Sequence, residues 1–445
     1  MESFLIAVVA MAVVLGIMIL VHEFGHYAAA KWFGVRVDVF SIGFGKRLAG
    51  FKRGDTDYRI SALPLGGYVK MAGENPLESR SGAPDEFMSH PRWQRFVIAI
   101  AGPAMNILLA IALLTGVFMV HYEHPLYLDE PAVIGWVMDD SPAAKSGIEQ
   151  GDRIVRIDGE QNPSWEDVML KVMISPKQSV EVAVQRGNDV LEKKIRPDAE
   201  GSEQYGNVGW LPEQPVIVTE LEPDMPAAKA GIQLGDDLVS VDGTPIHSVF
   251  SMIHFLQQNG GKPVDVVAIR KGQHLNFNVT PVQTDDGGQK AYRLGFRAEP
   301  VRVDKLPFAK ALDRSLDQNK KFSLLMVDLI HKMVERKVSI KQLDGPIGIA
   351  RASGDAARQP GWTPLLSLMA MISLNLGILN LLPIPILDGG IIMLLIVESI
   401  MRRDISLRIK ERIYQTAFVF LVLFFVVVIY NDLMKALPGL AQRLP

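Results

Sequence analysis

The residues best suited to chemistry form the pattern His22-Glu23-Phe24-Gly25-His26, within an apolar run that begins at Phe4. On a helix, His22 and His26 are four positions apart and project from one face. Both imidazoles can then hold one metal ion, while Glu23 activates a water molecule bound to it. So short a pattern also arises by chance. Its apolar surroundings favour a functional site, because ionisable side chains in lipid are costly and are usually retained for a function.

The composition is that of a protein partly in lipid and partly in water. The 445 residues are 48% hydrophobic, with a mean hydropathy of +0.17 and a formal charge of only -3. No strong net charge indicates binding to nucleic acid. The chain has no cysteine, so a metal must be held by histidine and carboxylate groups. A signal peptide is a poor interpretation of the apolar start, because no basic residues precede it and no cleavage site is evident.

Four segments are long and apolar enough to enter a bilayer, given that a span takes roughly 20 residues. They lie within residues 1–30, 96–120, 363–400 and 413–434. Basic residues gather in the connection after the first segment and in the connection before the last: Lys31, Arg36, Lys46, Arg47, Lys52, Arg53, Arg59, Lys70, Arg92 and Arg95, then Arg402, Arg403, Arg408, Lys410 and Arg412. The positive-inside rule predicts that both connections face the cytoplasm, with both termini and residues 121–362 outside.

A catalytic zinc ion commonly takes three protein ligands, and the third can be sought by elimination. The apolar segments contain histidine only at positions 22 and 26, and the third segment contains two carboxylates, Asp388 and Glu398. Glu398 is close to Arg402 and Arg403, which predicts an interfacial ion pair. Asp388 is therefore the candidate ligand. The alternative is a buried aspartate held by hydrogen bonds alone.

The third segment is irregular around Asp388. Pro383 and Pro385 remove backbone donors and predict an extended break within the span. Such a break is tolerated only against protein or a water-filled cavity, so we expect its exposed backbone to meet substrate. Asn375 and Asn380 add amides that can hold a substrate, although hydrogen bonds between helices would explain them equally well.

These motifs resemble the site-2 protease family of intramembrane zinc metalloproteases. The paired signatures are His22 to His26 and the run Asn380-Leu-Leu-Pro-Ile-Pro-Ile-Leu-Asp-Gly389. The resemblance implies that His22, His26 and Asp388 bind zinc and that Glu23 is the general base. It also implies that Asn380 positions the substrate.

Residues 31–95 form a cytoplasmic β-region in this interpretation. Polar and apolar residues alternate from Val35 and from Asp57, which indicates strands. Hairpin turns would explain the glycines at 43, 45, 66 and 67. The resemblance implies a membrane-associated sheet with a re-entrant loop, whose Gly66, Gly67 and Tyr68 lie beside the active site. An open strand edge there can pair with an unwound substrate. Residues 102–106 resemble another family motif, to which we assign packing and no chemistry.

The external region contains an internal repeat. The run from Ser141 to Gly159 recurs from Met225 to Gly243, after a shift of 84 positions. The repeated pattern is similar to bacterial PDZ domains, which predicts two tandem modules at residues 126–212 and 213–304. Gly209-Trp210 and Leu294-Gly-Phe296 resemble the loop that cradles a peptide carboxylate. The family interpretation is a pair of periplasmic domains that exclude bulky substrates.

Residues 305–362 are predicted to be an amphipathic helix and a linker. Phe308, Leu312, Leu316 and four later apolar residues recur at helical spacing, which suits a helix on the outer membrane surface or on the PDZ domains. We expect Gly345-Pro-Ile-Gly348 to break the chain before the third span.

The predicted fold is thus a multi-pass α-helical membrane protein with four transmembrane segments, a membrane-associated β-region and two tandem periplasmic PDZ domains. The resemblance implies a zinc metalloendopeptidase of the bacterial inner membrane. Its substrates would be a single-span anti-sigma factor after a first cleavage, and remnant signal peptides. The alternative function is an inactive PDZ-bearing scaffold or receptor, which the intact motifs argue against.

Overall fold

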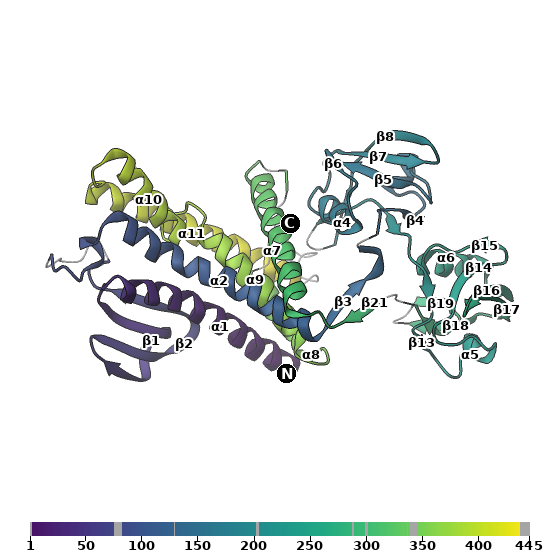
Figure 1. Cartoon of the computed structure of the whole chain (residues 1–445), viewed down its shortest axis with the longest axis horizontal. Coiled ribbons are helices and arrows are strands. Elements are labelled where there is room, and N and C mark those ends of the chain that lie inside the picture. The colour runs from purple at the N-terminus through teal and green to yellow at the C-terminus, as the bar shows by residue number, and fades with distance from the viewer. Residues whose placement is uncertain are drawn as a thin grey trace. The chain divides into compact units, whose positions relative to one another are not determined.

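The computed structural model describes residues 2–74, 82–128, 130–201, 204–286, 289–298, 301–335, 337–338 and 345–436 (Figure 1). The chain divides into two compact units. The first comprises Met1–His121, Lys305–Ile330 and Leu343–Pro445, and the second comprises Tyr122–Asp304 and His331–Gln342.

Helices dominate the first unit. They are α1 (Glu2–Trp32), α2 (Arg92–Val120), α7 (Phe308–Val334), α8 (Pro346–Arg358), α9 (Thr363–Asn380), α10 (Asp388–Met401) and α11 (Leu407–Ala436), with a short 3-10 helix, η1 (Phe87–Ser89). Within the described residues, α1, α2, α9 and α11 are long and apolar enough to cross a membrane. The helices and the β-rich remainder fit a membrane protein.

Small residues let the helices approach one another closely. A Cβ atom added to Gly25 of α1 would lie 2.3 Å from the Ala101 carbonyl oxygen of α2. One added to Gly377 of α9 would lie 3.0 Å from the Pro103 carbonyl oxygen, again on α2. Because lipid gives no hydrophobic drive between helices, such close packing is what holds them together. In Figure 1, α1, α2 and α9 run side by side.

The β-region is one long hairpin of β1 (Val37–Arg53) and β2 (Thr56–Met71), folded into a small sheet. Phe40 pairs with both Val69 and Tyr58, so the first half of β1 lies between two parts of β2. The segment 67–71 of β2 is thus at an edge, because the described register pairs it on one side alone. The prediction that Gly43 and Gly45 lie in hairpin turns is wrong. They lie inside β1 at positive φ, where the register shifts, and the turn is at Gly54.

The amphipathic helix α7 does not bury its apolar stripe. Its buried residues are Ala311, Ser315 and Asn319, and the Ser315 hydroxyl donates to the Ile111 carbonyl of α2 at 2.9 Å. Phe308 and Leu316 are exposed instead. Small and polar residues thus form the contact of α7 with α2, while Leu312, Phe322, Met326, Leu329 and Met333 are half-buried.

The expected chain break at Gly345–Gly348 is wrong, because Pro346 begins helix α8. The fixed φ of proline suits a first helical position. The carboxylate of Asp432 on α11, only 1% exposed, accepts hydrogen bonds from the backbone amides of Gly345, Ile347 and Gly348. A carboxylate also suits the positive end of the helix dipole. Asp432 therefore joins α11 to α8, which packs on α1.

The second unit contains two similar modules, each with its own core. The first has α3 (Pro142–Lys145), β5 (Arg153–Ile157), β6 (Glu160–Gln161), α4 (Trp165–Met173), β7 (Val180–Arg186) and β8 (Asp189–Ile195). Its counterparts, each beginning 84 positions later, are α5 (Pro226–Lys229), β14 (Asp237–Val241), β15 (Thr244–Pro245), α6 (Val249–Asn259), β16 (Val264–Arg270) and β17 (Gln273–Val279). In Figure 1 each module is a group of strands with one longer helix.

Shorter strands complete this unit: β3 (Tyr122–Pro125), β4 (Ile134–Val137), β9 (Asp198–Glu200), β10 (Tyr205–Asn207), β11 (Trp210–Pro212), β12 (Val216–Ile217), β13 (Glu220–Leu221), β18 (Val282–Asp286), β19 (Gln289–Arg293), β20 (Phe296–Arg297) and β21 (Val301–Asp304), with a 3-10 helix, η2 (Leu126–Leu128). β21 pairs with β3. The chain therefore enters and leaves the two modules at one place.

The same ion pair stabilises both modules. Arg186 meets Asp152 in the first module, and Arg270 meets Asp236 in the second, each at 2.7 Å from Nε to Oδ1. The hydrogen bond from Arg270 lowers the pKa of the Asp236 carboxyl. Each aspartate also accepts a hydrogen bond from the backbone amide of the residue three positions before it. This hydrogen bond closes the Gly-Asp turn of the repeat.

Glu398 forms a different ion pair from the predicted one. Its carboxylate lies 2.6 Å from Nζ of Lys410, and the two side chains are 1% and 8% exposed. It also accepts a hydrogen bond from the Ile405 amide. Arg402 and Arg403 are exposed and project elsewhere, because Arg402 ends α10 in the left-handed conformation and turns the chain. The pair is buried between α10 and α11.

Replacing Lys410 alone should destabilise the protein strongly. Lys410→Met leaves Glu398 buried without its counter-charge, which costs about 3–5 kcal/mol, whereas removing both charges of a buried pair is often nearly neutral. The apparent unfolding temperature in detergent should fall for Lys410→Met and recover by more than half in Glu398→Leu/Lys410→Met. Arg403→Met, on the exposed side, is the matched control and should change little. A double variant less stable than Lys410→Met would contradict this account.

Candidate metal centre

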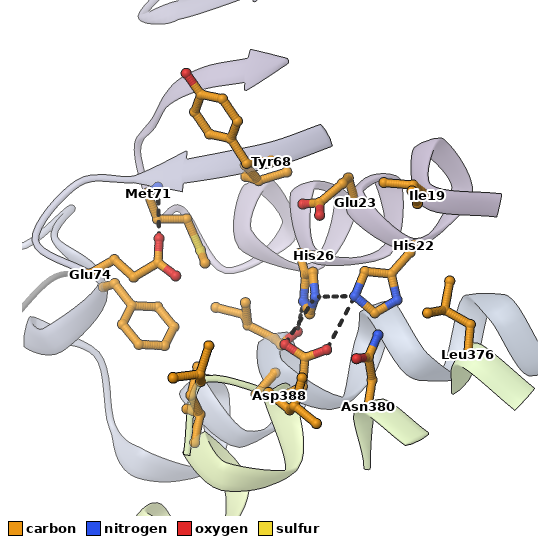
Figure 2. Close-up of a pocket in the computed structure, with 17 residues that line it drawn as sticks. Ile19, His22, Glu23, His26, Tyr68, Met71, Glu74, Leu376, Asn380 and Asp388 are labelled. Atoms are coloured by element: carbon orange, nitrogen blue, oxygen red, sulfur yellow. Dashed lines mark hydrogen bonds and ion pairs between the residues drawn. The ribbon is translucent and has the colours of Figure 1, made fainter. Parts of the chain in front are cut away.

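Helix α1 presents His22 and His26 on one face, as their spacing requires. Each is 7% exposed, and their ring centroids are 4.8 Å apart. Figure 2 shows the two imidazoles facing the carboxylate of Asp388, which begins α10. Residues from opposite ends of the chain therefore meet inside a bundle of apolar helices.

The connection between α9 and α10 places Asp388. The helix stops at Asn380 and resumes at Asp388. Ile386 has a φ of 100°, a costly conformation for a β-branched residue. The turn is tight enough that a Cβ atom on Gly389 or Gly390 would meet backbone carbonyl oxygens at 2.2 and 2.4 Å. The glycines after Asp388 thus allow the carboxylate to turn back toward α1.

The three side chains are spaced as zinc ligands would be. Nε2 of His22 lies 3.2 Å from Nε2 of His26 and 3.2 Å from Oδ2 of Asp388, while Nε2 of His26 lies 3.3 Å from Oδ1 of Asp388. Zinc bonds of 2.0–2.1 Å in a tetrahedron imply ligand atoms about 3.3 Å apart. The described residues contain this group alone as a set of three possible ligands.

The protonation of His26 also fits a cation. Its Nδ1 atom lies 2.8 Å from the carbonyl oxygen of Ile98 on α2. A carbonyl only accepts hydrogen bonds, so Nδ1 carries the proton and Nε2 of the neutral ring has a lone pair. That lone pair and the Asp388 carboxylate converge on one point with His22. Acceptors gathered without a hydrogen between them repel one another unless a cation lies among them.

Glu23 lies on another side of the imidazoles. In the view of Figure 2 it is on the side toward Tyr68 and away from Asp388. The backbone amide of Val69 hydrogen-bonds to its carboxylate. A Cβ atom on Gly67 would lie 3.5 Å from Cγ of Glu23 and 2.7 Å from the Ser41 carbonyl oxygen. The edge segment of β2 thus packs directly against the predicted base.

The site opens into a cavity of about 350 Å³. Its polar lining comprises His22, Glu23, His26, Tyr68, Glu74, Asn380 and Asp388. Glu74 accepts a hydrogen bond from the Met71 amide at 3.2 Å, and burial raises the pKa of its carboxyl. A cavity of this volume has room for a short stretch of peptide backbone, and its lining offers that backbone polar partners.

The predicted substrate residues divide into two groups. Tyr68 and Asn380 line the cavity, and Gly67 packs against the side chain of Glu23. Gly66 packs against the ring of Phe44. The described cavity lining does not include Asn375, Pro383 or Pro385; the two prolines instead shape the turn before Asp388.

Asn106 is the residue to which sequence reasoning assigned no chemistry. It is fully buried on α2, and its Nδ2 atom lies 3.2 Å from Nδ1 of His22. An amide within an otherwise apolar span was the available signal. Its partner could not be inferred, because the contact depends on how α2 crosses α1.

The chain was compared with known proteins. The model of peptidase family M50 matches residues 10–424. The chain belongs to peptidase family M50. It is 33% identical over 462 residues to the regulator of sigma-E protease RseP of Escherichia coli, covering 97% of this chain and 99% of the relative. A regulator of sigma E protease from Salmonella typhi is 32% identical over 463 residues, with the same coverage.

Membership of family M50 confirms the resemblance to site-2 proteases. The chain is a zinc metalloprotease. Its apolar helices and these relatives indicate a multi-pass protein of the inner membrane.

Adding one methyl group to Gly102 should weaken zinc binding. A Cβ atom there would lie 2.3 Å from Nε2 of His26, and the ring cannot move away without losing its bond to Ile98. Gly102→Ala should therefore hold zinc at least about tenfold more weakly, as disturbed supporting contacts commonly do. The readout is zinc affinity of purified protein by chelator competition.

The matched control is Gly116→Ala on the same helix, where an added Cβ atom meets nothing within 4 Å. Both changes favour helix formation equally. Equal zinc affinity in the two variants would show that the space beside His26 is not limiting.

Proposed function

We propose that this protein cuts the membrane segments of single-span proteins, with zinc held by His22, His26 and Asp388 and with Glu23 as general base. The observation that carries the proposal is the convergence of these three ligands beside Glu23 at a cavity among apolar helices. Bound zinc would supply Lewis-acid chemistry, acidifying water and polarising the scissile carbonyl.

The protein groups then handle the proton and the peptide. The Glu23 carboxylate takes a proton from the attacking water and returns it to the leaving amine. Asn380, which lines the cavity together with Asp388, would donate its amide to a substrate carbonyl. The Val69 amide keeps Glu23 oriented.

The charge pattern supports a site within the membrane. Lys31 lies in the last turn of α1, nine positions after His22, which is about 13 Å along a helix. With the basic connections in the cytoplasm, both termini and residues 121–362 face the periplasm. The zinc site is then nearer the cytoplasmic side.

Substrate would bind as an added strand. A peptide within a helix is shielded by its own hydrogen bonds, so it must unwind before cleavage. Tyr68, Val69 and Met71 of the edge segment 67–71 line the cavity, and the described register pairs this segment with β1 alone. Backbone pairing there would hold an extended peptide next to Glu23.

The two modules of the second unit would be PDZ domains that restrict access. Their repeated elements support this assignment, as do Gly209-Trp210 and Leu294-Gly-Phe296, which resemble a carboxylate-binding loop. In the periplasm they would exclude proteins that still carry an external domain. Substrates would then be anti-sigma factors after a first cleavage, in line with the relatives' names, and remnant signal peptides.

Glu23→Gln should abolish cleavage while zinc stays bound. The amide cannot take a proton, and removing a general base costs about 10²–10⁴-fold in rate. Asp388→Asn should lose both activity and zinc. The assay is cleavage of a single-span peptide by purified protein in detergent, with zinc content measured in parallel. Cleavage by Glu23→Gln at the native rate would show that another residue is the base, and unchanged zinc in Asp388→Asn would exclude the third ligand.

Removing both modules should broaden the substrate range. Pro125 and Val301 are paired across β3 and β21, so residues 126–300 can be replaced by a short turn. The shortened protein should cut a single-span substrate whose external domain is intact, which the full chain leaves uncut. A truncated substrate, cut equally by both proteins, controls for folding. Continued rejection of the intact substrate would contradict a filter.

A further inference from the structure

One face of α2 meets both histidines of the metal centre. Ile98, Gly102 and Asn106 are four residues apart and therefore share this face. The Ile98 carbonyl accepts from Nδ1 of His26, and Gly102 leaves room for the His26 ring. Asn106 lies at Nδ1 of His22.

Asn106 is held firmly in this place. It is fully buried, and its backbone carbonyl accepts the Ser373 hydroxyl of α9 at 2.8 Å. Its side chain makes one hydrogen bond among the described residues, the one to His22, and its Oδ1 atom has no hydrogen-bond partner there. We infer that the hydrogen bond to His22 is the reason for a buried amide at this position.

The direction of this hydrogen bond follows from the chemistry of the site. A neutral His22 that offers the Nε2 lone pair to a cation carries its proton on Nδ1. A proton on Nδ1 needs an acceptor, and an amide nitrogen cannot serve as one. The oxygen and nitrogen of a side-chain amide fill nearly the same space. A half-turn about the Cβ–Cγ bond therefore brings Oδ1 of Asn106 next to Nδ1 of His22.

We propose that Asn106 is a positioning residue of the zinc centre, whose Oδ1 accepts the Nδ1 proton of His22. It does for His22 what the Ile98 carbonyl does for His26. Both rings are thereby fixed in the tautomer and orientation that direct Nε2 at the metal. The inference rests on the proposed zinc site and adds a residue that touches neither metal nor substrate.

The test measures zinc affinity of the full chain in detergent by chelator competition. Asn106→Leu removes the acceptor and should weaken zinc binding about 10–100-fold, as loss of a supporting partner does. Asn106→Ala removes it without adding bulk and should act alike. Asn106→Asp keeps an acceptor and should retain zinc, which a purely structural role of the amide would not predict.

Ser373→Ala is the matched control, because it loosens the same helix crossing without touching His22. It should bind zinc as the native chain does. The inference is overturned if Asn106→Ala and Asn106→Leu hold zinc as tightly as the native chain, or if Asn106→Asp loses as much affinity as they do.

Asp388→Asn separates this inference from the proposed site. If Asp388→Asn weakens zinc binding and the Asn106 variants do not, the inference fails alone. If none of these variants weakens it, the proposed ligand set fails as well.

Discussion

Two imidazole nitrogens and a carboxylate converge within about 3.3 Å of one another inside an apolar bundle, and the rest of the first unit depends on this convergence. In lipid such groups repel and are expensive unless a cation neutralises them. Bound zinc would therefore join α1 to the start of α10 as well as supply chemistry. The protein must bring three helices close enough to achieve this, which explains why glycines stand where α2 meets α1 and α9.

The surrounding elements divide the work. Helix α1 carries ligands and base on different faces, because His22 and Glu23 are neighbours in sequence and point in different directions. Helix α2 supplies contacts to both imidazoles, at Ile98 and at Asn106. The strained turn through Ile386 delivers the carboxylate. Each element therefore fixes one part of the site, and a small shift of any helix would separate ligands that only the fold brings together.

Much of this site could be predicted because lipid makes ionisable residues rare. Elimination selected Asp388 for that reason, and the structure places it against His22 and His26. Contacts that depend on chain direction or helix crossing could not be predicted. Glu398 pairs with Lys410 and not with its sequence neighbours, since Arg402 turns the chain away. Helix α8 was missed because Gly345-Pro346 signals a break as readily as a helix start. The buried face of α7 carries Ala311, Ser315 and Asn319, which the spacing of its apolar residues did not predict.

The position of Glu23 links the base to the strand proposed to hold substrate. Its carboxylate accepts a hydrogen bond from the Val69 amide, and Gly67 lies against its side chain. A peptide that paired with segment 67–71 would therefore lie next to the residues that orient the base. All three residues lie on α1, but the Glu23 carboxylate is also hydrogen-bonded to the strand. A displacement of that segment would therefore move the carboxylate relative to the imidazoles. Cleavage would then require segment 67–71 to be in the position that orients Glu23. Binding of a substrate strand to this segment would thereby be coupled to catalysis.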